Sequence, residues 1–501
     1  MYLSRYLSNI SADILNKNVS QLLLDEATAE LIHWQTTRIH VDILPHISNQ
    51  PQNLKIYILE EVLSGKSPPS TDEAAVFLLS SPLLQSTLIS LNSYISKISA
   101  STIICQNTAL YKQLNESLIK TTADVDIYHI NCSNINIAPD IHLIPAYNTQ
   151  PAIRSDIYYW QGAETTIGGK IEPNNISASY KLELQVLSEH ILCLCSELGV
   201  TPDVFSIGSS SRVLAKNIIS VIREDEPTEF GKKASLILID RTLDMATVLS
   251  HCGDNLLDRV CGCFPDWCDD SSDVRINMSR MFSEKYITPN YVPGCLSQPN
   301  NIIAQNLIKS LATLRPQEVL LEIVASLLDG LKKMGHKSPL PQRLGRITST
   351  HLSALLEAYS KLDIADIARH AGELQIAEAC IGCLEGGERS REWDTMQSRE
   401  KLLTLVLTQD TDAQSVNLQL KEIVDNSNNL SQLLTTLLYV MLSSSEIVVR
   451  EVEEIMKEEM VNKIVEGGEN FLECLSDELK RIARNKASLR LWLNDILIRF
   501  K

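Results

Sequence analysis

Short apolar runs alternate with helix-like stretches along the first quarter of the chain, and this alternation restricts the fold more than any other feature of the sequence. Between the runs, Ala27–Trp34 and Leu84–Ile98 have apolar residues at roughly helical spacing. Strands that alternate with helices form a parallel sheet that helices cover on both faces. We therefore predict an α/β first domain at residues 1–131. Its strands are expected at Val19–Leu24, Leu54–Leu59, Ala74–Leu79, Ser101–Cys105 and Asp124–Ile130.

A polar stretch with Asn and Pro, residues 131–175, marks a boundary before a second group of elements. The run Ala234–Ile239 has the strongest strand signal in the chain, and a charged loop precedes it. The sequence therefore predicts a second α/β domain at residues 132–248. Its other elements are expected at Leu182–Leu198, Val204–Ile207 and Val213–Ile222.

Helical periodicity dominates residues 249–501, so a mainly helical third domain is predicted there. Pro316 begins a helix in which leucine recurs at steps of three and four residues, and Gly335 ends it. A helical hairpin is expected near residues 349–384, with Ser349–Ser360 as its first helix and Ile364–Leu384 as its second. The fold class is thus α/β plus α. Further helices are expected at Ser398–Leu442, Glu446–Glu466 and Phe471–Arg499.

The charge balance argues against nucleic acid as a partner. The 501 residues include 45 Lys+Arg and 62 Asp+Glu, which gives a formal net charge of −17. Such a chain repels phosphate backbones and anionic lipid headgroups. The net charge leaves open a local basic patch, because it does not describe how charges are distributed.

The sequence has no continuous apolar stretch of membrane-spanning length, and its amino terminus lacks the pattern of a secretory signal. Its 12 cysteines are scattered without regular spacing, as in proteins with reduced thiols. We expect a cytoplasmic protein without direct membrane insertion that partners recruit to the periphery of endomembranes, at the ER, the Golgi or elsewhere.

The strand Ala234–Ile239 runs directly into Asp240 and Arg241, and Asp244 follows three residues later. Two carboxylates at a strand end can hold a guanidinium between them. A partly buried ion pair that fixes a domain corner is the expected role, and its loss would cost roughly 2–4 kcal/mol. A catalytic carboxylate pair is the alternative, but no base or nucleophile near it in the sequence completes such a site.

Two groups of residues raise the question of a cofactor. A histidine and four cysteines lie within 18 residues, but Cys-Gly-Cys is too tight for a zinc knuckle, so core thiols are favoured over zinc. Cys380 and Cys383 are read as packing residues. Gly168-Gly169-Lys170 lacks the other residues of a phosphate loop. No cofactor or metal is expected. The zinc candidates are His251, Cys252, Cys261, Cys263 and Cys268.

Several motifs together resemble one family. A buried strand that runs into Asp-Arg-x-x-Asp is typical of the SM (Sec-one/Munc-eighteen) proteins, which bind SNAREs. Three further runs resemble one branch of that family, the Sec-one family domain-containing proteins. These runs are His251–Leu256, Pro293–Gln298 and Leu344–Thr348.

The resemblance implies an arch of two α/β domains and a helical third domain, with a cleft that holds a syntaxin-like helix bundle. It implies a non-enzymatic regulator of vesicle docking, fusion and exocytosis, with SNARE proteins and possible tethering-complex subunits as partners. Two alternatives stay open at this point. One is a structural tether subunit that does not template SNAREs, and the other is a nucleotide-binding α/β enzyme.

The family resemblance also suggests where a partner helix would bind. The second helix of the hairpin is similar to the family segment that follows the tip on which SNARE helices are templated, although a proline that many members have at the tip is absent. An apolar stripe between charged flanks would leave one helix face accessible. The candidate residues are Asp366, Arg369, His370, Glu373 and Glu378.

Family members usually return to the second domain with a carboxy-terminal strand, a glycine-rich turn and a closing helix. This sequence has nothing similar up to Lys501. Either the return is lost in this lineage or the chain is truncated, and the second sheet is expected to have an exposed edge.

Overall fold

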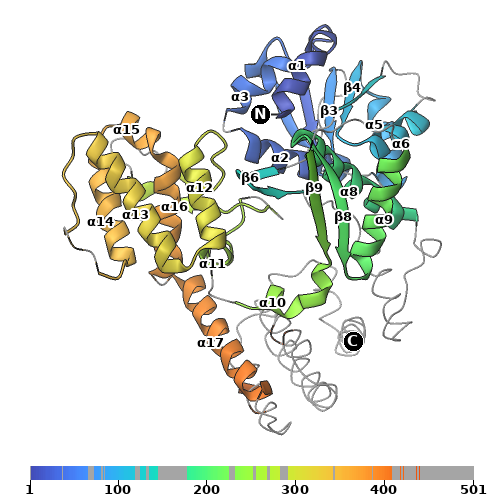
Figure 1. Ribbon diagram of the computed structural model, residues 1–501. Coiled ribbons are helices and arrows are strands. Elements are labelled where there is room, and N and C mark those ends of the chain that lie inside the picture. Colours follow the sequence, from blue (N-terminus) through green and yellow to red (C-terminus); the bar gives the residue numbers. More distant parts are fainter. Residues whose placement is uncertain are drawn as a thin grey trace. The chain divides into compact units, whose positions relative to one another are not determined.

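A computed structural model describes most of the chain up to residue 408 (Figure 1). Contacts divide the chain into two compact units, and each is described by itself. Unit 1 comprises Met1–Ile153, Ile171–Ile239 and Pro265–Ile381, and unit 2 comprises Arg154–Lys170, Asp240–Phe264 and Gly382–Lys501. The described residues are 2–408 without 37, 66–72, 81–82, 84, 119–124, 131–134, 145–177, 225–231, 252–254, 268–270, 282–291, 342, 344 and 386, together with 418, 421, 422, 436 and 439.

A five-stranded parallel sheet begins unit 1, with the strand order β2-β1-β3-β4-β5. The inner strands β1, β3 and β4 are buried along their whole length, whereas the edge strands β2 and β5 are partly exposed. Strands that helices cover on both faces have this continuous apolar character. The prediction of a parallel first sheet is confirmed. The strands are β1 (Gln21–Leu24), β2 (Lys55–Ile58), β3 (Ala75–Leu79), β4 (Ser101–Cys105) and β5 (Val125–His129).

Helices pack on this sheet through a core that includes the fully buried Phe77, Ile103 and Leu110. Asp25 follows β1 directly and caps the next helix, because its side chain accepts a hydrogen bond from the backbone N–H of Thr28. The helices are α1 (Tyr2–Leu15), α2 (Glu26–Gln35), α3 (Ile39–Asp42), α4 (Leu59–Leu63), α5 (Gln85–Ile95) and α6 (Thr108–Leu118).

A β-hairpin follows where the sequence suggested only a polar linker. Strands β6 (Ile135–Ala138) and β7 (Ile141–Leu143) pair antiparallel, and Ile135 is fully buried. The alternation of Ile and polar residues in this run is a strand pattern that its Asn-rich surroundings obscure.

Two longer strands of unit 1 form the described part of the second sheet. Strands β8 (Val200–Ile207) and β9 (Lys232–Ile239) pair in parallel, and helices α8 (Ala178–Glu197) and α9 (Ser209–Glu224) pack on one face of them. On the other face Phe205 is 55% exposed. The alternation of helix and strand that was expected in this region is present in α8, β8, α9 and β9.

Helices account for most of the remaining described residues, as predicted. None of the helices that the structure describes is long and apolar enough to cross a bilayer. The predicted helices at Glu446–Glu466 and Phe471–Arg499 and the Gly168–Lys170 run lie outside the described residues. Unit 1 contains β10 (Ile276–Asn277), β11 (Pro293–Gly294), α12 (Ile302–Thr313), α13 (Pro316–Lys333), α14 (Ser349–Tyr359), α15 (Ile364–Arg369) and most of α16 (Ala371–Leu384), and unit 2 contains α10 (Met245–Leu249), α11 (Leu256–Cys263) and α17 (Glu388–Thr408).

Candidate partner-binding site

The helical hairpin is present, but its second arm is two helices instead of one. The predicted helix Ile364–Leu384 breaks at His370, whose φ of −108° and ψ of 16° end α15 before α16 begins. The break separates a short exposed helix from a long buried one.

The tip of the hairpin, residues 359–369, contains exposed side chains, although Tyr359 and Ile367 within it are buried. Lys361 pairs with Glu357 at 2.8 Å, and Arg369 pairs with Asp366 at 2.9 Å. The aliphatic side chain of Ile364 is 46% exposed beside these charges. Exposed ion pairs of this kind contribute little to stability, so their charges are available to a partner.

Glu373 and His370 lie inside the structure. Glu373 is only 2% exposed, and its Oε2 accepts a hydrogen bond from Asn301 Nδ2 at 2.8 Å. The Nδ1 atom of His370 lies 3.3 Å from the other carboxylate oxygen, and its ring meets that of Tyr359 edge to face. The expectation that Glu373 lies on an accessible face is therefore wrong: its carboxylate is buried and is held by Asn301 and His370.

Close backbone packing buries α16 on nearly all sides. A Cβ at Gly372 would come within 2.6 Å of the Ala304 Cβ on α12. Leu374, Ile376 and Ala377 have no exposed surface. A helix that is apolar all round belongs in a core. Cys380 and Cys383 are buried as well, so the reading of both as packing residues is confirmed.

Glu378 occupies an intermediate position. Its Oε2 lies 3.5 Å from the guanidinium of Arg280, and its side chain is 17% exposed. Of the five candidate residues, only Asp366 and Arg369 lie on the tip, and only Arg369 is largely exposed.

The Asp-Arg-x-x-Asp motif forms an exposed turn in unit 2. Arg241 donates to the backbone oxygen of Asp244 at 2.7 Å and lies 3.9 Å from its carboxylate, and both side chains are more than half exposed. Asp240 is buried at 7% exposure. The predicted pairing with Asp244 is present, but the partly buried guanidinium is not, because a 3-10 turn at Arg241–Asp244 follows the strand.

Replacing Arg241 by Ala should therefore change the free energy of unfolding by less than about 1 kcal/mol, since exposed ion pairs are weak. Urea denaturation of the variant beside the parent chain measures this. A loss above about 2 kcal/mol would show that the guanidinium has a buried partner after all.

The zinc candidates are only partly described, since Cys252 and Cys268 lie outside the described residues. His251 Nδ1 lies 2.6 Å from Glu400 Oε1, and its backbone N–H donates to the other oxygen of the same carboxylate. Its ring also meets Trp393 edge to face. Through these contacts His251, which precedes α11, is held against helix α17.

A buried carboxylate hub at Asp273 was not predicted from the sequence. Asp273 has no exposed surface, and it accepts hydrogen bonds from the backbone N–H groups of Val274 and Leu296 on one oxygen and of Ser297 on the other. His33 Nε2 on α2 lies 2.7 Å from the second oxygen. The hub fastens the Pro293–Gln298 run to the helix that follows β1.

Three side chains at this hub are close enough to suggest a metal site. The ligand atoms of His33, Asp273 and Cys295 lie within 4.8 Å of one another. A metal ligand pair, however, leaves room for the ion, whereas His33 and Asp273 are in direct hydrogen-bond contact. Burial also raises the pKa of the Cys295 thiol to about 12, which disfavours the thiolate that zinc binds. These three side chains therefore fit a structural role, in which hydrogen bonds join two segments of the chain, better than they fit metal binding.

The carboxyl edge of the first sheet is where a doubly wound fold binds nucleotides. Here three of its polar side chains, Asp25, Ser80 and Asn107, are held by hydrogen bonds to one another or to the backbone. Asp25 accepts from the backbone N–H of Ser80 at 2.6 Å, and Asn107 donates to the Ser80 carbonyl at 2.7 Å. Burial raises the pKa of Glu60 to about 7, but one perturbed acid does not complete a reaction site.

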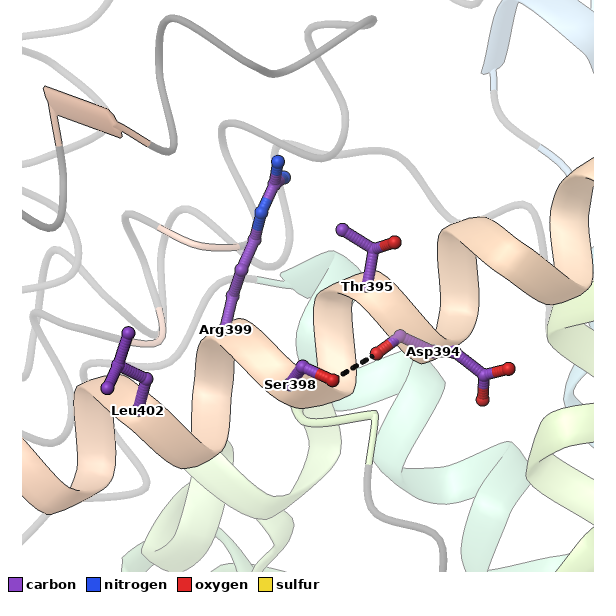
Figure 2. A pocket seen from close by; sticks show the side chains of 5 residues that line it. All are labelled: Asp394, Thr395, Ser398, Arg399 and Leu402. Carbon is purple, nitrogen blue, oxygen red and sulfur yellow. Dashed lines mark hydrogen bonds between the residues drawn. The ribbon is translucent and has the colours of Figure 1, made fainter.

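A shallow pocket lies along one face of α17 in unit 2 (Figure 2). Within it, Ser398 donates to the backbone oxygen of Asp394 at 2.7 Å, which leaves its hydroxyl committed to the helix. Burial lowers the pKa of Arg399. The lining offers no pair of catalytic groups in mutual contact among the described residues. Its residues are Asp394, Thr395, Ser398, Arg399 and Leu402.

The described residues thus contain a parallel α/β sheet, a second parallel strand pair and a helical region with a hairpin. These elements are the ones that the resemblance to the SM proteins implied, and comparison with known proteins finds relatives of the same kind. The chain is 24% identical over 499 residues to Sec1 family domain-containing protein 2 of Mus musculus, and the match covers 90% of this chain and 71% of the mouse protein. The chain is thus similar to a Sec1 family domain-containing protein over most of its length.

The human protein of the same name is 25% identical over 309 residues, which cover 59% of this chain and 44% of that protein. Among solved structures, the crystal structure of Sly1p in complex with an N-terminal peptide of Sed5p aligns with 96% of this chain and 70% of that chain, at 14% identity and a TM-score of 0.44. No family model matches the chain.

Proposed function

We propose that this chain is a regulator of vesicle-mediated protein transport that binds SNARE helices, syntaxin-like ones first, and performs no bond chemistry. The observation that carries the proposal is its relationship to a Sec1 family domain-containing protein over 90% of its length. At the carboxyl edge of the first sheet, Asp25 and Asn107 form structural hydrogen bonds, which is consistent with a protein that binds without catalysis.

The proposed contact surface is the hairpin tip, residues 359–369. A helix binds there by covering the apolar side chain of Ile364 while its charges meet Lys361 and Arg369. Preorganised binding of this kind lowers the entropic cost of bringing helices into register. The protein acts in the cytoplasm, at endomembranes where its partners reside.

Affinity purification of the tagged chain from cells, followed by mass spectrometry, tests the proposal. SNARE proteins among the specifically retained partners are the expected result. Tethering subunits without SNAREs would replace it with the structural-subunit alternative, and metabolic enzymes without either would overturn it.

A further inference from the structure

The loop between α13 and α14 has a charge opposite to that of the chain as a whole. No Asp or Glu occurs between Asp329 and Glu357, whereas the chain overall has a net charge of −17. The loop and the last turn of α13 supply Lys332, Lys333, Lys337, Arg343 and Arg346. All five of these residues are exposed. We refer to them as the basic loop.

Part of this charge is explained by the helix itself. Lys333 pairs with Asp329 at 2.6 Å and holds the pKa of that carboxyl below its usual value. Lys332 also lies in the last turn, where cations favour the negative end of the helix dipole. Within the described part of the chain, no carboxylate forms an ion pair with Lys337, Arg343 or Arg346. Those three residues carry the uncompensated charge.

The basic loop is held at both ends. Gly335, with a φ of +80°, ends α13, and the backbone N–H of His336 reaches back to the Leu331 carbonyl at 2.9 Å, which is the Schellman pattern. At the other end Ile347 is buried, and Gln317 donates to its carbonyl at 3.0 Å. The exposed cations are therefore presented on a fixed base.

We propose that the basic loop is an electrostatic docking site for an anionic membrane surface. Met334 and Leu340 are half-buried among the cations, and a bilayer interface accommodates apolar and basic side chains together. Headgroups of a fluid bilayer also adapt to any spacing of cations, whereas a folded acidic partner must match it. The site requires no inserted segment.

The acidity of the rest of the chain does not prevent this contact. Charges farther from the membrane than the Debye length, about 8 Å at physiological salt, are largely screened. Each Lys or Arg near an anionic surface strengthens partitioning by roughly fivefold. The three uncompensated cations thus contribute about 100-fold together. The inference goes beyond SNARE binding and differs from the expectation that partners alone recruit the chain.

Vesicle co-sedimentation of the purified full chain tests the proposal. We expect binding to phosphatidylcholine vesicles that contain about 30% phosphatidylserine, weaker binding to phosphatidylcholine alone, and loss of binding in about 0.5 M salt. The triple variant Lys337→Glu, Arg343→Glu, Arg346→Glu should bind the anionic vesicles at least about 100-fold more weakly.

The matched control reverses three exposed cations elsewhere in unit 1, through Lys97→Glu, Arg212→Glu and Lys216→Glu. It changes the net charge equally and should bind within about twofold of the parent chain. Equal loss in both triple variants, or no preference for anionic vesicles, would overturn the proposal. Binding of a polyglutamate peptide without binding of vesicles would overturn it too, and would indicate an acidic protein partner. If the chain does not bind anionic vesicles but SNARE proteins are still purified with it, the membrane proposal is overturned and the proposed function stands.

Discussion

Replacement of Asp273 by Ala is expected to lower the free energy of unfolding by about 3–5 kcal/mol, the range for breaking a fully buried charged hydrogen-bond network. The change leaves the backbone N–H groups of Val274, Leu296 and Ser297 without their acceptor in a site that water does not reach. Urea denaturation followed by tryptophan fluorescence measures it, because Trp267 stacks on His33 beside the hub at a ring distance of 5.0 Å.

A graded series strengthens this test. Asp273→Asn keeps one oxygen acceptor but turns an amide donor toward the Ser297 N–H, so a smaller loss of about 1–3 kcal/mol is expected. Asp366→Ala on the hairpin tip removes only an exposed pair with Arg369 and serves as the control. An Asp273→Ala variant as stable as this control would show that the hub is not what fastens the Pro293–Gln298 run.

The second large effect is expected for Glu373→Lys, at about 3–5 kcal/mol. The new ammonium group would replace a carboxylate that is 2% exposed and would face the amide donor of Asn301 instead of accepting from it. Thermal melting and urea titration report the loss. Glu373→Gln, which retains an acceptor for Asn301, should be milder, at about 1 kcal/mol.

Arg369→Glu is the matched surface change, because the Arg369 guanidinium is 65% exposed and pairs with the nearby Asp366. It should change stability by less than about 0.5 kcal/mol. A combined change at both positions would confound unfolding with loss of binding. Equal stability of Glu373→Lys and Arg369→Glu would contradict the buried position of Glu373.

The sequence alone predicts the elements that are buried along their whole length. The inner strands β1, β3 and β4 are apolar on both faces, so their runs stand out from the surrounding helices. The hairpin β6–β7 was missed, because a short strand with one polar face resembles a loop in an Asn-rich stretch.

The hub at Asp273 could not be found from spacing. Its main partners are backbone N–H groups, which every residue but proline has. The other partner is His33, which lies far away in the sequence on α2. The Pro293–Gln298 run resembles one family in sequence, and in the structure the backbone N–H groups of its Leu296 and Ser297 donate hydrogen bonds to Asp273. Glu373 was misplaced for a related reason: a charge on a helix usually marks a solvated face, and only the tertiary structure shows the asparagine that holds it.

Binding of the purified chain to purified SNARE cytoplasmic domains tests the central proposal most directly. The titration compares the parent chain with Arg369→Glu and with Ile364→Asp, two changes at the hairpin tip, and with Arg241→Ala as a control in unit 2. We expect saturable binding of at least one syntaxin-like domain, a loss of affinity of roughly 2 kcal/mol for Ile364→Asp, a smaller loss for Arg369→Glu and no change for Arg241→Ala. Binding that none of the tip changes weakens would contradict the assignment of the site, and no binding to any SNARE domain would contradict the proposed function.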